Sequence, residues 1–182
     1  MKKYFLFVAL LMNALLLTAQ DNGDVKVYAD QKLTTITYEM SHPLHDWSGV
    51  SKDVKSVIVT DDKKETIKRV AVTVKIASFD SQNANRDSHC IEVTEALKFP
   101  NINFVSSNIE QNGDNLKVTG DLTFHGYKKK ITFDATKKKI GNNKIQVNGG
   151  FSINMKDFKV DPPSLMGISS DEMIKLSFEA VY

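Results

Sequence analysis

The sequence predicts an all-β domain with about eight antiparallel strands, closed as a barrel or packed as a sandwich, and one short helical insertion. Three observations support this prediction: an alternating hairpin pattern at residues 117–136, further alternating stretches on both sides of it, and one break at residues 78–99. Successive strand residues point to opposite faces, so each alternating stretch has one apolar and one polar face. Such half-buried sheets are typical of antiparallel folds.

The clearest pattern is the hairpin, whose residues read KVTGDLTFHGYKKKITFDAT. Leu122 and Phe124 alternate with polar residues before His125 and Gly126, and Phe133 continues the apolar phase after them. A two-residue turn needs positive φ angles, which Gly126 adopts easily. We therefore expect two paired strands with their apolar faces on the same side.

Other stretches repeat the alternation and complete the predicted sheet. Residues 41–52 contain Pro43 and Gly49, which indicate a bent or interrupted strand. Residues 157–171 contain two prolines and a glycine, so we expect a loop there. Residues 24–38 contain two short strand patterns, and the alternation of the second continues to Met40. The remaining expected strands lie at residues 54–60, 67–76, 102–110, 144–155 and 174–182.

The helical insertion is expected near residues 84–90. Asp80 or Ser81 could cap this helix, and a second short turn near residues 93–97 would end before Pro100. The insertion contains the single cysteine of the chain, so no internal disulfide is possible and the fold must rest on packing.

The N-terminal residues are typical of a secretory signal peptide. They read MKKYFLFVALLMNALLLTAQ, in which two lysines precede an apolar run and Ala19 offers a small residue for cleavage. We expect residues 1–19 to be removed, which leaves a mature domain over residues 20–182 that is periplasmic or secreted. An uncleaved membrane anchor would need a longer apolar span.

The net charge and the spacing of the histidines argue against nucleic-acid binding and against a zinc site. The formal net charge is +2, and two lysines lie in the expected leader, so the mature chain is near neutral and a nucleic-acid partner is not expected. His42 and His45 could hold a metal, but no Cys or carboxylate stands around them at a zinc spacing. The sequence also has no phosphate loop or nucleophile elbow.

The neighbours of Cys90 do not establish a catalytic site. A cysteine nucleophile needs a positioned base and an oxyanion hole, and a histidine next to it in sequence, His89, provides neither by itself. The simpler interpretation is that an Arg86–Asp87 pair and His89 tie the helix to the barrel. We therefore predict no catalytic residue, no metal and no cofactor, in a protein that is not an enzyme.

The apolar face supplies the candidate binding residues. Alternation alone does not decide whether this face lines a lumen or meets lipid, nor whether a lumen would be hollow. If it lines a hollow barrel, the predicted ligand-binding residues are Tyr38, Trp47, Phe104, Leu122, Phe124, Phe133, Phe151, Ile153, Phe158, Leu176 and Phe178.

Several short pieces of the sequence form an ordered set with specific spacing. They are His42 and residues 47–51, 85–89, 99–104, 118–126, 151–154, 156–158 and 170–172. Through these pieces the chain resembles the YceI-like family of secreted, lipocalin-like proteins over nearly the whole mature sequence. The resemblance implies an eight-stranded antiparallel lipocalin-like barrel whose hydrophobic lumen holds a polyisoprenoid or isoprenoid-quinone-like chain in the bacterial periplasm.

Functions of different classes remain open at this point. The first is a non-catalytic binding or transport protein for an isoprenoid or another long apolar lipid. The second is a small integral outer-membrane barrel, in which the apolar face would meet lipid. An enzyme using His89 or His42 ranks last, because no convergent acid–base set is visible. The oligomeric state is also open, a homodimer included.

Overall fold

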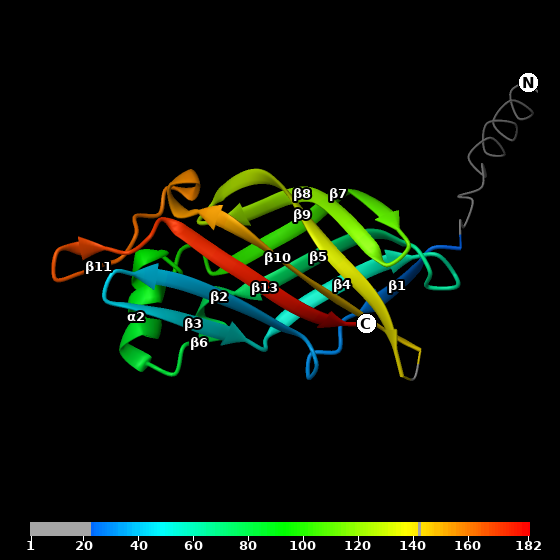
Figure 1. Cartoon of the computed structure of the whole chain (residues 1–182), viewed down its shortest axis with the longest axis horizontal. Coiled ribbons are helices and arrows are strands. Elements are labelled where there is room, and N and C mark those ends of the chain that lie inside the picture. The colour runs from blue at the N-terminus through cyan, green and yellow to red at the C-terminus, as the bar shows by residue number, and fades with distance from the viewer. Residues whose placement is uncertain (1–22, 142) are drawn as a thin grey trace, which may run out of the picture.

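The computed structural model describes residues 23–141 and 143–182. In these residues eleven strands form one antiparallel sheet, in the order β1-β4-β5-β7-β8-β9-β10-β13-β2-β3-β6. The sheet curls around its own long axis, with helix α2 at one end (Figure 1). The predicted all-β barrel class with a short helix is confirmed. The sheet has eleven strands where about eight were expected: the two-residue β6 was not foreseen, and the stretch expected as one bent or interrupted strand contains both the end of β2 and β3.

The elements have the following bounds. The sheet consists of β1 (Val25–Tyr28), β2 (Thr35–His42), β3 (His45–Ser51), β4 (Val54–Thr60), β5 (Ile67–Lys75), β6 (Phe79–Asp80), β7 (Asn101–Asn112), β8 (Asn115–Phe124), β9 (Tyr127–Ile140), β10 (Lys144–Asn154) and β13 (Met173–Val181). A separate hairpin contains β11 (Ser164–Leu165) and β12 (Ile168–Ser169). The helical elements are η1 (Ile76–Ser78), α2 (Ala84–Val93) and η2 (Met155–Phe158).

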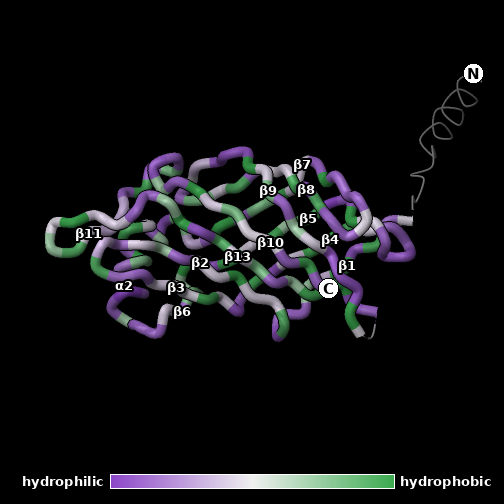
Figure 2. The backbone as a smooth tube through the Cα atoms, viewed as in Figure 1, coloured by the Kyte–Doolittle hydropathy of each residue, from purple (hydrophilic) through white to green (hydrophobic). Residues whose placement is uncertain are grey.

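The central hairpin forms as predicted from β8 and β9. Phe124 pairs with Tyr127, and the two turn residues His125 and Gly126 have φ angles of 49° and 75°. Positive φ at both positions is typical of the type I′ turn, whose twist matches that of the strands. Apolar and polar residues alternate along these and the other strands, as the tube in Figure 2 shows.

Residues 41–52 contain an interruption, as predicted, but the chain reverses there into a hairpin instead of bending. His42 at the end of β2 pairs with His45 at the start of β3, so Pro43 and Leu44 make a two-residue turn. Proline lacks the N–H that a strand interior needs, and it fits a turn instead. Gly49, which we took as a second sign of a bend, pairs normally with Tyr38 inside β3.

The helix has a different cap and a later end than expected. Neither Asp80 nor Ser81 caps it; the side chain of Asn83 accepts a hydrogen bond from the Arg86 amide at 3.1 Å. The helix continues to Val93, three residues beyond the predicted end. The cap prediction was wrong because all these residues can accept such a bond, and only the backbone path selects among them.

The expected Arg86–Asp87 pair does not form, which is a second correction. Asp87 accepts hydrogen bonds from the amide and the hydroxyl of Ser81, at 3.1 and 2.6 Å. The guanidinium carbon of Arg86 instead lies 5.7 Å from the centre of the Trp47 ring. Adjacent helix residues point in different directions, so neighbours in sequence do not face each other.

Residues 157–171 are more ordered than the predicted loop. Ser164 pairs with Ser169 across the β11–β12 hairpin, which projects beyond the same end of the sheet as α2 (Figure 1). His42 ties this hairpin to the sheet: the Leu44 amide donates to its Nδ1 at 3.1 Å, and its Nε2 bonds to the Ile168 carbonyl at 3.0 Å.

The pairing of β9 with β10 stops partway along the two strands. Its last pair in the described residues is Ala135 with Gly149. Beyond this point, β9 pairs only with β8, and residues 150–154 of β10 pair only with β13. On this side η2 approaches β9, where Asp157 lies 3.9 Å from Lys129.

The predicted signal peptide, residues 1–19, lies outside the described residues, so the structure does not test it. Within the described ranges, no helix has the length and apolar character to cross a membrane.

Candidate ligand cavity

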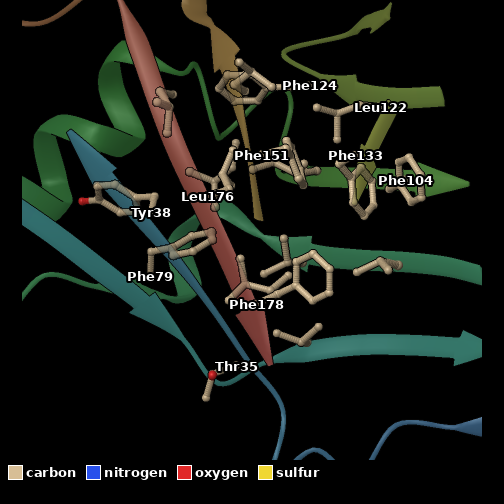
Figure 3. Close-up of a pocket in the computed structure, with 18 of the residues that line it drawn as sticks. Thr35, Tyr38, Phe79, Phe104, Leu122, Phe124, Phe133, Phe151, Leu176 and Phe178 are labelled. Carbon is tan, nitrogen blue, oxygen red and sulfur yellow. The ribbon is translucent and has the colours of Figure 1, made fainter. Parts of the chain in front are cut away.

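A cavity of about 350 Å³ lies inside the curled sheet. This volume is within the range of pockets that bind small ligands. The inward faces of the strands supply its wall, and Figure 3 shows aromatic and aliphatic side chains from several strands pointing into it. Several of these residues are only half-buried even though they face inward, among them Phe133, Phe151 and Phe178. Their remaining accessible surface faces the cavity, so the interior is hollow rather than filled.

Phe133 is the hub of an aromatic cluster on the cavity wall. Its ring centroid lies 4.9 Å from that of Phe151, 5.4 Å from Phe104 and 5.9 Å from Phe178. Offset-stacked and edge-to-face pairs at such distances add stability beyond the area they bury. The cluster therefore stabilises one side of the wall.

Two glycines in the strands make room for rings that line the cavity. A Cβ atom on Gly49 would lie 2.5 Å from Cε1 of Tyr38, and one on Gly149 would lie 2.6 Å from Cζ of Phe178. Carbon atoms do not approach so closely, so any larger residue would push the ring away. The absence of a side chain at these positions thus helps to set the shape of the cavity.

Ten of the eleven predicted binding residues line the cavity. Phe158 is the exception: it is 1% exposed in η2 and packs against Phe124 with centroids 5.5 Å apart. It supports the wall from behind. The residues that line the cavity are Tyr38, Trp47, Phe104, Leu122, Phe124, Phe133, Phe151, Ile153, Leu176 and Phe178. Their role in binding a ligand remains a prediction.

The end of the cavity farthest from α2 is enclosed. Ile58 and Leu116 line it and are 1% and 3% exposed. Here the hydroxyl of Tyr182 hydrogen-bonds Ser56 Oγ at 2.6 Å. Burial raises the pKa of Tyr182 to about 12, so this hydroxyl stays neutral. We call this region the deep end; its polar groups are neutral and bonded to each other.

The opposite end, beside α2, is the more exposed and more polar one. We call it the mouth and define it by the lining residues His45, Trp47, Arg86, His89 and Leu165. Ring centroids of His45 and Trp47 are 5.5 Å apart, and Arg86 lies over the same tryptophan. Sequence reasoning assigned only Trp47 to the site. The other mouth residues were missed because they lie outside the alternating strand patterns: His45 follows a turn, Arg86 and His89 lie in α2, and Leu165 lies in the β11–β12 hairpin.

The described residues offer little to a metal ion. They contain no group of three or more His, Cys, Asp or Glu side chains placed to hold one. The rings of His42 and His45 are 5.7 Å apart, and both nitrogens of His42 already bond to the backbone. His42 is therefore a link between the β2–β3 turn and β12.

Cys90 lines the cavity, but its environment does not activate it. Burial raises the pKa of its thiol to about 11, and the negative charge of Asp87 adds to the shift. The neighbouring His89 is partly exposed, and its Nδ1 lies 3.4 Å from Glu92 Oε2. A nucleophilic thiol needs a lowered pKa or an adjacent base. The Cys90 thiol is thus a neutral, mostly apolar part of the wall.

Comparisons with known proteins agree with this geometry. Residues 28–182 match the model of the YceI-like domain. The protein YceI of Escherichia coli O17:K52:H18 (strain UMN026 / ExPEC) is 30% identical over 170 residues, 87% of this chain and 87% of that protein. Crystalline BcnA of Burkholderia cenocepacia has a TM-score of 0.75 at 21% identity, over 85% of this chain and 99% of that one. A polyisoprenoid binding domain from Saccharophagus degradans, implicated in plant cell wall breakdown, has a TM-score of 0.68 at 10% identity, over 88% of this chain and 97% of that one. These two likenesses show the fold.

Proposed function

Since this chain belongs to the YceI-like family, we propose that it is a non-catalytic binding or transport protein that holds an isoprenoid or another long apolar lipid in its cavity. The observation that carries the proposal is the hollow, aromatic-lined cavity inside the sheet. The polyisoprenoid binding domain of similar fold supports the same class of ligand.

The cavity suits an apolar chain better than a polar substrate. Its middle is lined by aliphatic and aromatic side chains such as Val72, Phe133 and Leu176, which offer no hydrogen bonds. Burial of a methylene group contributes about 0.8 kcal/mol, so a few isoprene units give useful affinity without polar recognition. The unactivated Cys90 thiol supports a role without catalysis.

The orientation of the two faces favours a carrier over an integral membrane barrel. On β10, Phe151 lines the cavity whereas its neighbour Ser152 is exposed, and on β9 Phe133 lines it whereas Thr132 is exposed. A membrane barrel needs the apolar face outside. Washing host membranes with carbonate tests this choice, because a carrier is released and an integral barrel stays.

The proposed location is the periplasm or the exterior of the cell. It rests on the leader-like residues 1–19, and we expect a mature chain that starts at or near Gln20. N-terminal sequencing of protein exported by the host tests the location, and an intact Met1 would contradict it. A homodimer is not needed for this role, because residues of one chain bound the cavity.

The binding test uses neighbouring residues on opposite faces of β10. Phe151→Asp places a charge on the cavity wall and should abolish displacement of a fluorescent lipid, or unfold the domain. Phe151→Leu keeps the apolar character and should fold but bind a long isoprenoid about 1 kcal/mol more weakly. Ser152→Asp is the matched control and should bind like the wild type.

The outcomes separate the two models. Circular dichroism checks that each variant is folded, and mass spectrometry of co-purified lipids identifies the natural ligand. Loss of binding in Ser152→Asp together with normal binding in Phe151→Leu would mean that the ligand-binding face is the outer one, and the carrier proposal would fail.

A further inference from the structure

We propose that the mouth binds the anionic head group of the lipid, a carboxylate or a phosphate, through Arg86 where it lies over Trp47. The inference rests on the proposed function, since it requires that an apolar chain occupies the cavity. It adds a polar recognition site to a cavity whose remaining wall selects only by shape.

The charge of the cavity wall is one-sided. Among the described residues that line it there is no Asp, no Glu and no Lys, and Arg86 alone carries a full charge at neutral pH. The other titratable groups of the lining at this end are three histidines, which carry no negative charge, and the Tyr38 and Cys90 side chains, which burial keeps neutral by raising the pKa to about 12 and about 11. A single cation beside low-dielectric walls attracts anions, because the field is focused there.

Most N–H donors of the Arg86 guanidinium group are not used within the described part of the protein. Arg86 is half-buried, its carbon lies 5.7 Å from the Trp47 centroid, and its Nη1 makes one long hydrogen bond of 3.5 Å to the Ser81 carbonyl. No ion pair to Arg86 forms within the described part of the chain. A guanidinium group has five N–H donors in a fixed fork, so most of them remain available to a ligand.

The carboxylates around the mouth are engaged elsewhere. Asp87 accepts two hydrogen bonds from Ser81, and Asp46 accepts one from the Ser41 hydroxyl at 2.5 Å. Glu92 lies beside His89 at 3.4 Å and is exposed on the helix. None of these three acids lines the cavity. The charge of Arg86 is thus not neutralised by a direct protein partner.

The position of Arg86 also sets the direction in which the lipid lies in the cavity. A carboxylate or phosphate can accept two parallel N–H bonds from the guanidinium fork, which a neutral head group matches less well. From this point the wall becomes apolar towards the deep end, where Tyr182 and Ser56 bond to each other and offer no charge. The head therefore stays at the mouth and the tail points inward.

The test compares ligands with the same chain and different heads. Palmitate, hexadecyl phosphate and neutral palmitamide are titrated into delipidated mature protein, with displacement of an uncharged fluorescent lipid as the readout. We expect one or both anions to bind at least about tenfold more tightly than palmitamide, as charge-assisted hydrogen bonds are the stronger ones. The anion that gains more shows which head group fits the mouth. Trp47 is the only tryptophan of the chain, so its emission gives an independent signal from the mouth.

Two variants locate the effect. Arg86→Gln should remove the preference for the anions, with a much larger loss of affinity for them than for palmitamide, whereas Arg86→Lys should keep part of the preference. Arg69→Gln, at the other arginine of the chain, is the control: the Arg69 side chain is exposed, pairs with Asp24 and is not part of the cavity lining, so no change is expected. Circular dichroism verifies the fold of each variant.

The outcomes are distinct. Equal affinity of the wild type for all three ligands, or an equal loss for all three in folded Arg86→Gln, would overturn the head-group site and leave the carrier function standing. If the wild type binds none of these ligands or the fluorescent lipid, the carrier function fails, and the inference fails with it.

Discussion

Phe133 and Phe151 stack with centroids 4.9 Å apart and planes 26° apart, just beyond Ala135 and Gly149, the last backbone pair between β9 and β10. The two rings continue the contact between the strands where backbone hydrogen bonding has ended. This stacking, rather than a ladder, holds that part of the cavity wall together.

Replacing the hub of this cluster should weaken the whole domain. Phe133→Ala removes contacts with three rings, and we expect the free energy of unfolding to fall by about 2 kcal/mol, less than for a fully enclosed phenylalanine because one side already faces the cavity. Urea denaturation measures the loss. Thr132→Ala, on the exposed face of the same strand, should cost less than about 1 kcal/mol. Equal losses would show that the aromatic cluster contributes little.

A methyl group at Gly149 should reshape the cavity. It would lie 2.6 Å from Phe178 Cζ, so Gly149→Ala should displace that ring, reduce lipid affinity and destabilise the fold by about 1–3 kcal/mol. The matched control is Gly141→Ala, because a Cβ atom there meets nothing within 4 Å. Lipid displacement and urea denaturation report the two effects. A Gly149→Ala variant that binds and unfolds like Gly141→Ala would contradict this account of the wall.

His125 should act as a link between three segments. Its side chain is 9% exposed; Nδ1 lies 2.9 Å from the Phe158 carbonyl and Nε2 lies 2.6 Å from Glu95 Oε2. Both partners are acceptors, so the ring satisfies them together only when both nitrogens carry a proton. His125→Asn isolates these bonds, because Asn-Gly suits the type I′ turn. We expect a loss of about 1–3 kcal/mol in urea denaturation. An unchanged or higher stability would mean that the turn, not the ring, matters.

The Cys90 thiol should react slowly in the folded protein. Its pKa is raised from 9.0 to about 11 by burial, which lowers the thiolate fraction near neutral pH by about a hundredfold. Alkylation by iodoacetamide should therefore be slow at pH 8, accelerate as the pH rises, and slow further when a lipid fills the cavity. Urea-unfolded protein is the control for the free thiol.

A companion variant tests the passive role of this residue. Cys90→Ser should leave lipid binding almost unchanged, because the thiol forms no disulfide and the replacement has a similar size. Rapid labelling of the folded wild type, or loss of binding in folded Cys90→Ser, would contradict the passive role.

The sequence predicts the inward face well because that signal is local. In β8, β10 and β13 the inward-facing apolar residues share one phase of the two-residue period, so the phase alone places Phe124, Phe151 and Phe178 on the cavity wall. Phe158 lies beyond the end of β10, in η2, where the two-residue period of a strand no longer applies. The strand pattern therefore did not predict its position, and Phe158 is not part of the cavity lining.

The features that sequence could not supply depend on contacts between distant segments. Arg86 contacts Trp47, which lies 39 positions earlier in the sequence, and the alternation of apolar residues gives no sign of this contact. The adjacent Asp87 suggested an ion pair with Arg86, but neighbouring helix residues point in different directions and Asp87 bonds Ser81 instead. The Pro43 turn shows a related limit: proline marks an interruption, but only the pairing of His42 with His45 shows that the chain reverses there.

The early end of the β9–β10 ladder exposes the protein to self-association. Within the described chain, residues 127–134 have a strand partner on one side only, and such an edge can template the addition of a strand from another molecule. Lys128, Lys129 and Lys130 are exposed along this edge. When two copies approach edge to edge, these like charges repel each other, and desolvating them opposes a continuous intermolecular sheet. Salt screens that repulsion, so concentrated protein should stay monodisperse at low ionic strength and lose this protection in molar salt.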